Sequence, residues 1–240
     1  MKLSKKIQII INAVLFLTVV IVGVIAFLPE KSVTISSGNG VVAIYNGDRN
    51  SNTVALTFNV YENTDIVNGI LNELKKEDVK ATFFVGGCWA DDNQTTLRRI
   101  INEGHELGNH GYYHKDHKKL DKDNNLKEIS SCGRIVFALT GYQMRLFAPP
   151  SGSFSKTTLS VANELGYQTI MWSKDTIDWR DNSVSLIVKR ATENITSGDI
   201  ILMHPKPHTL TALPEIIKNI KKANLNAVTV SECANLTVNT

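Results

Sequence analysis

The stretch VALTFNVYENT, Val54 to Thr64, combines a short apolar run with a polar loop. The run VALTF contains β-branched and aromatic side chains, which favour a buried strand. In an α/β barrel enzyme the carboxyl end of such a strand carries the chemistry, and an acidic residue is expected there. Here the strand ends in Asn59 and Val60, neither of which carries a charge. The chain is therefore either an enzyme without this acid or a protein that is not an enzyme.

From Val54 onward, apolar runs alternate with segments of helical periodicity. The apolar runs cover residues 54–58, 81–87, 106–110, 146–150, 168–172, 199–204 and 226–230, and the helical segments cover 65–77, 95–104, 125–141, 157–166, 185–195 and 213–223. Strand and helix in alternation indicate a parallel sheet covered by helices. No Gly-x-Gly-x-x-Gly follows the first strand, which disfavours a dinucleotide-binding fold. We predict an α/β fold, a distorted (β/α) barrel of about seven parallel strands, open or closed.

The N-terminal segment has the pattern of a membrane anchor. Residues 1–6 contain three lysines and precede residues 9–28, which are apolar apart from Asn12 and Thr18. A secretory core has about 7–15 residues, whereas a membrane span needs about 20. The pattern predicts a cytoplasmic basic segment, an uncleaved transmembrane signal anchor over 7–29, and a chain that faces outward from there. A cleaved signal peptide followed by secretion is the alternative.

The rest of the chain is expected to form a tether and one domain. Residues 30–52 predict a tether with a short lead-in strand around Val41 to Tyr45, and residues 53–240 predict the barrel domain. A formal net charge of +3 indicates no nucleic-acid partner. Three cysteines, an odd number far apart, do not form a disulfide framework and are expected to be buried small hydrophobes. The oligomeric state stays open.

Unusual polar residues and prolines follow several of the predicted strands. In chain order they are Asn59, His110, Pro149, Pro150, Asp175, Asp178 and His204. Since the carboxyl ends of barrel strands meet on one face, these residues are expected to share one site.

Two histidine motifs suggest chemistry at this site. NHGYYHKDH places His110 and His114 four residues apart, so on a helical turn both imidazoles would lie on one face and could share a metal ion. His117, beside two lysines, is expected to be solvated. His204 ends an apolar run and fits a general acid or base at the floor of a pocket, or a core histidine bonded to backbone. Asp175 needs a partner if buried, and a carboxylate on the far nitrogen of His204 would fix its tautomer.

Five motifs, in this order, resemble those of the polysaccharide deacetylases of carbohydrate esterase family 4, the group with the chitooligosaccharide deacetylase (NodB) homology domain. TFNV stands for the family's TFDD, HGYYH for His-Ser/Thr-x-x-His, FAPPSG for FRPPYG, DTIDW is intact, and LMH stands for Leu-x-His. The resemblance covers about Val54 to Val230 and is greatest to the sporulation-associated branch.

The resemblance implies a hydrolase that removes N-acetyl groups from amino sugars of a cell-wall or spore-wall polysaccharide, assisted by a divalent metal, expected to be zinc. His110 and His114 match the two histidine ligands of that metal. His204 matches the acid that protonates the leaving amine, and Asp175 matches the residue that tunes this acid. The substrate-pocket residues expected are Trp179, Leu202, Pro149, Pro150 and Asp178.

Three positions depart from the family. Asn59 replaces the base, Val60 replaces the metal carboxylate, and Ala148 replaces the Arg that positions the base. The changes are mutually consistent, because an Arg beside a neutral Asn would be an unpaired charge in a partly buried site. Glu62 would share the face of Val60 if the strand continued, which makes it a candidate third metal ligand or simply a solvated side chain. Asn59 could orient a water molecule but cannot take its proton.

Two functions follow from these residues. The first is a membrane-anchored, metal-assisted deacetylase of cell-wall glycan with a remodelled base. The second is a catalytically impaired, deacetylase-like protein that binds glycan in wall or spore assembly. General-base assistance contributes about 10²–10⁴-fold to a rate, so its loss would leave poor turnover.

Overall fold

The computed structural model describes residues 6, 12, 14–16, 18 and 40–236. Most of the basic segment, signal anchor and tether expected over residues 1–39 lies outside this set, so the anchor stays a prediction. No helix within the described residues is both long and apolar enough to cross a membrane. The fold below is that of residues 40–236, which lie in one compact unit.

Eight strands form one sheet in the described part of the chain, and all their pairings are parallel. The order is β5-β4-β3-β2-β1-β7-β6, with β8 also paired to β1. The strands are β1 (Thr53–Val60), β2 (Thr82–Val85), β3 (Glu106–Asn109), β4 (Leu146–Phe147), β5 (Gln168–Thr169), β6 (Lys174–Asp175), β7 (Ile200–Met203) and β8 (Asn226–Val228). All seven strands predicted from the apolar runs are present. Only β6 was not expected, because its two residues, Lys174 and Asp175, are charged and belong to no apolar run.

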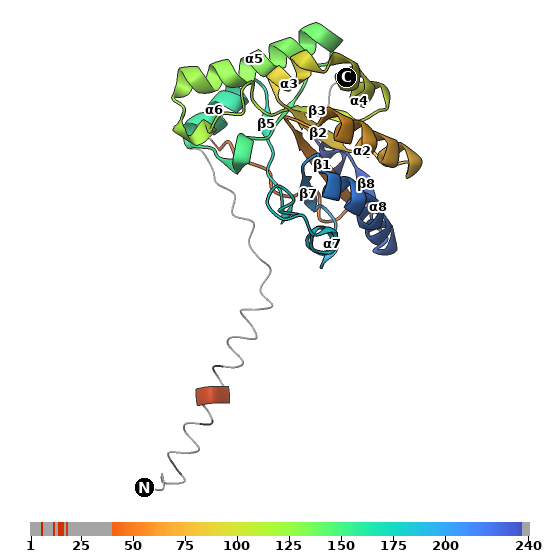
Figure 1. Ribbon diagram of the computed structural model, residues 1–240. Coiled ribbons are helices and arrows are strands. Elements are labelled where there is room, and N and C mark those ends of the chain that lie inside the picture. Colours follow the sequence, from red (N-terminus) through yellow and green to blue (C-terminus); the bar gives the residue numbers. More distant parts are fainter. Residues whose placement is uncertain (1–5, 7–11, 13, 17, 19–39, 237–240) are drawn as a thin grey trace. The chain divides into compact units, whose positions relative to one another are not determined.

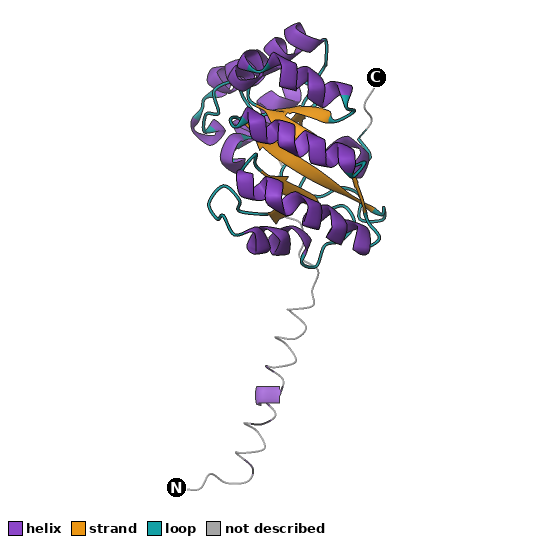
Figure 2. Cartoon of the chain, turned by 45° about the vertical axis from the view of Figure 1, so that its right-hand side comes forward, coloured by secondary structure: helices purple, strands orange, loops and turns teal. Residues whose placement is uncertain are grey.

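Helices cover the outer face of this curled sheet (Figures 1 and 2). They are α2 (Thr64–Lys76), α3 (Gly87–Asp92), α4 (Gln94–Asn102), α5 (Lys122–Thr140), α6 (Lys156–Glu164), α7 (Val184–Thr192), α8 (Pro207–Lys222) and α9 (Val230–Cys233). The predicted helical segments correspond to α2 and α4–α8. The parallel sheet and its helical cover confirm the predicted α/β architecture of a distorted barrel.

The side chains of β1 alternate between two environments. Val54, Leu56, Phe58 and Val60 are fully buried in the large core beneath the helices. Successive strand residues point to opposite faces, so Asn59 shares the inner face with Ala55 and Thr57. This alternation turns Asn59 toward the inside of the barrel and Val60 into the hydrophobic layer.

The lead-in segment forms isolated bridges rather than the expected strand. Ile44 pairs with Ile170 next to β5, and Asn46 pairs with Asp199 next to β7. The Arg49 guanidinium adds an ion pair of 2.9 Å with Asp199. The segment therefore joins two regions of the sheet that are far apart in sequence.

The three cysteines are free thiols. Cys132 and Cys233 are buried, as expected, and burial raises the pKa of both. Cys88 is only partly buried, and its thiol lies 3.2 Å from the hydroxyl of Tyr61.

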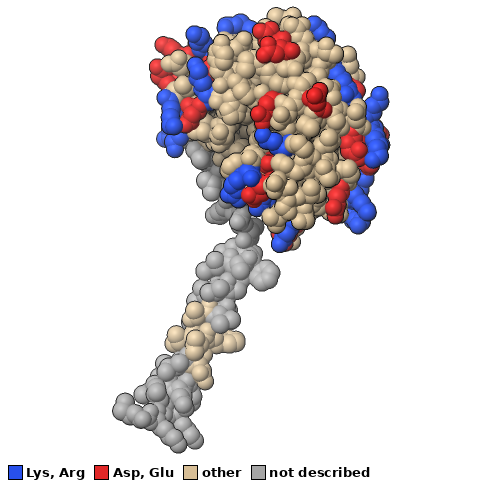
Figure 3. All heavy atoms as spheres, in the orientation of Figure 1, with Lys and Arg blue, Asp and Glu red and all other residues tan. Residues whose placement is uncertain are grey.

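Acidic and basic side chains are interspersed on the face of the domain drawn in Figure 3. Neither sign gathers there into one extended patch. The feature of this domain that is shaped for a ligand is instead a cavity.

Candidate functional site

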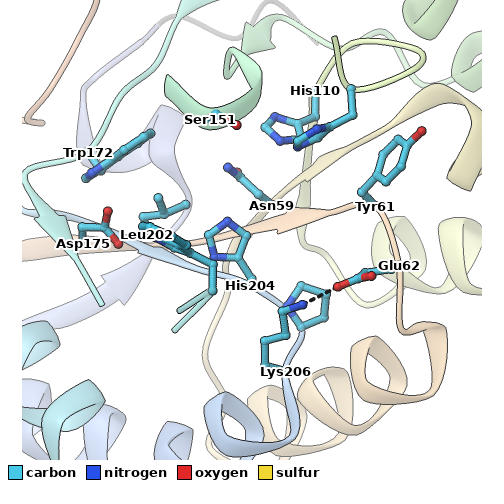
Figure 4. A pocket seen from close by; sticks show the side chains of 13 residues that line it. Asn59, Tyr61, Glu62, His110, Ser151, Trp172, Asp175, Leu202, His204 and Lys206 are labelled. Atoms are coloured by element: carbon cyan, nitrogen blue, oxygen red, sulfur yellow. Dashed lines mark hydrogen bonds and ion pairs between the residues drawn. The ribbon is translucent and has the colours of Figure 1, made fainter. Parts of the chain in front are cut away.

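A cavity of about 500 Å³ lies at the carboxyl ends of the strands (Figure 4). Eight of its lining residues were expected from the sequence: Asn59, Glu62, His110, His114, Asp175, Trp179, Leu202 and His204. Five were not: Tyr61, Ser151, Trp172, Pro205 and Lys206. Most of these five adjoin a predicted site residue, and that proximity along the chain is the only signal that could have found them.

Three residues expected in the substrate pocket do not line the cavity. Pro149 and Pro150 are buried and are not among its lining residues, and the following residue, Ser151, lines the cavity instead. Asp178 is 1% exposed and lies behind His204. These three side chains support the cavity rather than face a ligand.

His110, directly after β3, is buried and held in one tautomer. Its Nδ1 lies 2.7 Å from the carbonyl oxygen of Ala148. A carbonyl oxygen only accepts, so Nδ1 carries the proton and Nε2 is left as an acceptor. Burial lowers the pKa of His110 to about 3, and charge repulsion from the His114 and His204 imidazoles adds to this effect. The imidazole is therefore neutral at physiological pH.

His114 lies on a loop, and the helical turn expected over residues 110–114 is wrong. Gly111 (φ 73°) and His114 (φ 55°) both have left-handed backbone, which costs a residue such as His on the order of 1 kcal/mol. The loop still brings the His110 and His114 rings to a centroid distance of 5.1 Å. The Tyr61 ring lies 5.0 Å from that of His114. The imidazole pair is thus formed by a strained turn.

Two buried side chains hold this histidine loop. Asn109 accepts a hydrogen bond from the Gly111 N–H at 2.9 Å. Glu128, on α5 and 3% exposed, accepts from the N–H groups of Tyr112 and Tyr113 at 3.1 and 2.8 Å. Glu128 gives no signal in the sequence, because only the packing of α5 brings it under the loop.

His204 follows β7 and forms a pair with Asp178. Its Nδ1 lies 2.7 Å from Oδ1 of Asp178, and its backbone N–H donates to Oδ2 at 2.7 Å. The hydroxyl of Thr209 also donates to Oδ2, at 2.7 Å. Burial alone would raise the pKa of Asp178, but its hydrogen bond and attraction to His204 and the Thr209 hydroxyl lower it overall. The expectation that Asp175 is the partner of His204 is therefore wrong.

Asp175, at the end of β6, lines the cavity instead. Its Oδ1 accepts a hydrogen bond from the Ile177 N–H at 2.8 Å. Ile177 has left-handed backbone (φ 54°), and this turn separates the two carboxylates of DTIDW. One carboxylate faces the cavity and the other lies behind His204.

Asn59 is 6% exposed and lines the cavity. Its Oδ1 is enclosed and has no hydrogen-bond partner among the described residues. Figure 4 shows the nitrogen end of the amide directed into the cavity. An amide does not take a proton from water at neutral pH. The position at which the family that the sequence resembles has its base is therefore occupied by a residue that cannot act as one.

Glu62 forms an ion pair with Lys206 (Figure 4). Strand β1 ends at Val60, so the condition under which Glu62 would share the face of Val60 is not met. The ion pair connects the loop after β1 with the loop before α8. The Glu62 carboxylate therefore has a cationic partner from the protein itself.

The residues at this site do not fit a three-ligand metal. The described residues contain no group of three or more His, Cys, Asp or Glu side chains that could hold a metal ion. His110 and His114 offer two imidazoles, but Val60 is fully buried in the core. Catalytic zinc sites have about three protein ligands. The divalent metal expected from the resemblance lacks its third ligand here.

Two further histidines are buried in the scaffold. His117 is 0% exposed, with Nδ1 2.8 Å from the side-chain oxygen of Asn125, so the expectation that it is solvated is wrong. His105 accepts a hydrogen bond from the Ala81 N–H through Nδ1 at 3.2 Å. Burial lowers the pKa of His117, and lowers that of His105 to about 4.

Acidification is expected to destabilise the fold through these buried neutral histidines. The folded pKa values of His105 and His110 lie below the unfolded value of about 6.5. Their contribution to stability is therefore complete above about pH 6.5 and is lost progressively as the pH falls toward the folded pKa values. Between pH 7.5 and pH 5, each such histidine is expected to lower the free energy of unfolding by about 1–2 kcal/mol. Urea unfolding at the two pH values measures this change.

The variant His105→Asn isolates one of these histidines, since its side-chain oxygen can still accept the Ala81 N–H. The decrease in the free energy of unfolding between pH 7.5 and pH 5 should be smaller in this variant than in the wild type. An unchanged pH dependence would contradict a buried neutral His105.

The sequence of this chain is similar to those of known polysaccharide deacetylases. Residues 46–170 match the polysaccharide deacetylase family. The protein YlxY of Bacillus subtilis, itself uncharacterised, is 36% identical over 189 residues, which cover 79% of this chain and 59% of that protein. A peptidoglycan-N-acetylglucosamine deacetylase of Bacillus cereus is 34% identical over 191 residues, 78% of this chain and 70% of that protein.

Solved structures agree with the sequence comparison. The crystal structure of a CE4 family pseudoenzyme from Bacillus anthracis has a TM-score of 0.78 and 36% identity, covering 81% of this chain and 69% of that one. A mutant of that pseudoenzyme with restored enzymatic activity has the same TM-score, 0.78, at 34% identity, over 81% of this chain and 71% of that one.

This chain spans 59% of the length of YlxY and 38% of the PgdA deacetylase of Listeria monocytogenes. The family match nevertheless covers more than half of this chain and includes Asn59, His110 and His114. The chain belongs to the polysaccharide deacetylase family, carbohydrate esterase family 4.

Proposed function

We propose that this protein binds N-acetylated cell-wall glycan in the cavity beside His204, with little or no hydrolysis of the acetamide. The observation that carries the proposal is a cavity with Asn59 where the family has its base. The peptidoglycan deacetylases and the pseudoenzyme among its relatives support a wall glycan as the ligand. The apolar N-terminal run supports a place outside the membrane, where that glycan lies.

The cavity suits a sugar residue. Its volume of about 500 Å³ falls within the usual range of ligand sites, roughly 300–1,000 Å³. Leu202, Trp172 and Trp179 give it apolar walls. Aromatic rings offer flat, partly apolar faces, which suit the C–H face of a pyranose ring. Binding does not require the missing base.

Hydrolysis lacks two of its requirements. Asn59 cannot take the proton of an attacking water, and a positioned base contributes about 10²–10⁴-fold. Val60 is buried in the core and Glu62 is paired with Lys206, so neither completes a metal site. Together these features favour binding over turnover.

Slow deacetylation is the second candidate, favoured by the intact His204–Asp178 pair. The Asp178 carboxylate holds the Nδ1 proton of His204 at 2.7 Å, which directs Nε2 to the cavity. A protonated Nε2 could donate to a departing amine. This step is the part of the family's chemistry that the described side chains still support.

Binding and hydrolysis are separated by measuring both on the full-length protein in detergent. The ligands are a tetramer of N-acetylglucosamine and muramidase-digested peptidoglycan, with calorimetry for binding and an acetate assay for hydrolysis. We expect saturable binding with little or no acetate release, and binding that persists in His204→Ala. Acetate release at the rate of an intact deacetylase, abolished in His204→Ala, would establish the second candidate. Absence of binding to both ligands would overturn the proposal.

A further inference from the structure

We propose that Asn59 recognises the acetylation state of the sugar. Its amide nitrogen donates a hydrogen bond to the acetamido carbonyl oxygen, so the cavity selects N-acetylated over N-deacetylated amino sugars. The inference rests on the proposed glycan binding and assigns its selectivity to one side chain.

The backbone of Asn59 is held firmly. It lies in β1, between β2 and β7, and is in register with Phe84 of β2. The side chain is 6% exposed, which restricts its rotation. A donor on such a rigid element is positioned before the ligand arrives, and this lowers the entropic cost of binding.

The accessible end of the Asn59 amide is its donor. Oδ1 is enclosed and has no hydrogen-bond partner among the described residues. The nitrogen end faces the cavity (Figure 4). The N–H groups are therefore accessible from the cavity and can donate to a ligand acceptor, and such a hydrogen bond contributes about 1 kcal/mol to binding.

Other polar groups of the cavity leave this role to Asn59. His110 presents an unprotonated Nε2, and Asp175 presents a carboxylate, so both are acceptors. Lys206 is engaged by Glu62. The other side chains of the lining that can donate are at least partly exposed, including Tyr61, Ser151, Trp172, Trp179 and a protonated His204. Asn59 is thus the buried neutral donor among the described lining residues.

The two forms of the sugar differ in the hydrogen bonds that they can make. An acetamido group carries a carbonyl oxygen that accepts. The ammonium of a deacetylated sugar only donates, as a lysine ammonium does. Opposite the Asn59 N–H groups, the first makes a hydrogen bond and the second places donor against donor. The family's aspartate at this position acts as a base that takes up a proton. Asn59 instead donates a hydrogen bond and keeps its proton.

The test measures binding of the full-length protein to a tetramer of N-acetylglucosamine and to its deacetylated counterpart at pH 7. The wild type is expected to prefer the acetylated tetramer by about tenfold, the worth of one hydrogen bond. Asn59→Asp, of the same shape, is expected to abolish this preference, because a carboxylate cannot donate to the carbonyl oxygen and attracts the ammonium. Asn59→Leu, which is similar in size, should bind the acetylated tetramer with about tenfold lower affinity. Its affinity for the deacetylated tetramer should not increase.

The matched control is Asn224→Asp, in the exposed turn between α8 and β8. It makes the same charge change outside the cavity and should keep the wild-type preference. An unchanged preference in both Asn59 variants would overturn the inference and leave glycan binding intact. A wild type that binds neither tetramer nor wall fragments would instead overturn the proposed function.

Discussion

Replacement of Val60 by aspartate is expected to lower the free energy of unfolding by about 3–5 kcal/mol without metal, and zinc is expected to restore most of it. Val60 is fully buried in the hydrophobic core, and an unpaired charge in such a place is costly by about this amount. The new carboxylate stands one residue after Asn59, where the family has its metal ligand. Val60 is the last residue of β1, and a local shift that turned the carboxylate from the core toward His110 and His114 would complete a set of three ligands. Zinc at about 1,000 times its Kd contributes about 4 kcal/mol.

Urea unfolding with a chelator and with zinc measures both effects. Val60→Thr is the matched control, since threonine has the shape of valine and no charge. Val60→Thr should lower the free energy of unfolding by less than Val60→Asp does. Zinc should not change the free energy of unfolding of Val60→Thr or of the wild type. If zinc leaves Val60→Asp unstable, the side chain at position 60 is held in the core away from the histidines.

The second large effect is expected at Asp178, where replacement by alanine should cost about 3 kcal/mol of stability. Three donors converge on this carboxylate: Nδ1 and the backbone N–H of His204, and the hydroxyl of Thr209. Removing the acceptor leaves buried donors without partners, at about 1–3 kcal/mol each where water does not reach them.

Asp175→Ala is the control within the same motif. Asp175 accepts one hydrogen bond, from Ile177, and faces the cavity, so its loss should cost about 1 kcal/mol. Urea unfolding of the two variants at pH 7 compares the carboxylates directly. Equal losses would contradict the assignment of Asp178 as the partner of His204.

The helices and strands could largely be predicted because their signals are local. Alternation in β1 and the apolar stripe of α2 repeat with the periods of a strand and a helix. Strand β6 consists of two charged residues and belongs to no apolar run, so it gives no such signal. The helical turn at His110 and His114 was wrong because i, i+4 spacing does not report backbone handedness, and the turn is left-handed at Gly111.

The cavity could also be predicted in outline. Parallel strands place their carboxyl ends on one face, so Asn59, His110 and His204 had to come together once the strands were assigned. The replacements at Asn59 and Val60 are visible in the sequence itself, and with them the doubt about hydrolysis.

The sequence alone therefore determined the alternating α/β order, the family motifs and the absence of the two acids. Tertiary structure alone decided that Asp178 rather than Asp175 pairs with His204, that Lys206 pairs with Glu62, and that Glu128 supports the histidine loop. These pairs join segments far apart in the chain. Their distances depend on how strands and helices pack in three dimensions, and no local period in the sequence records that packing.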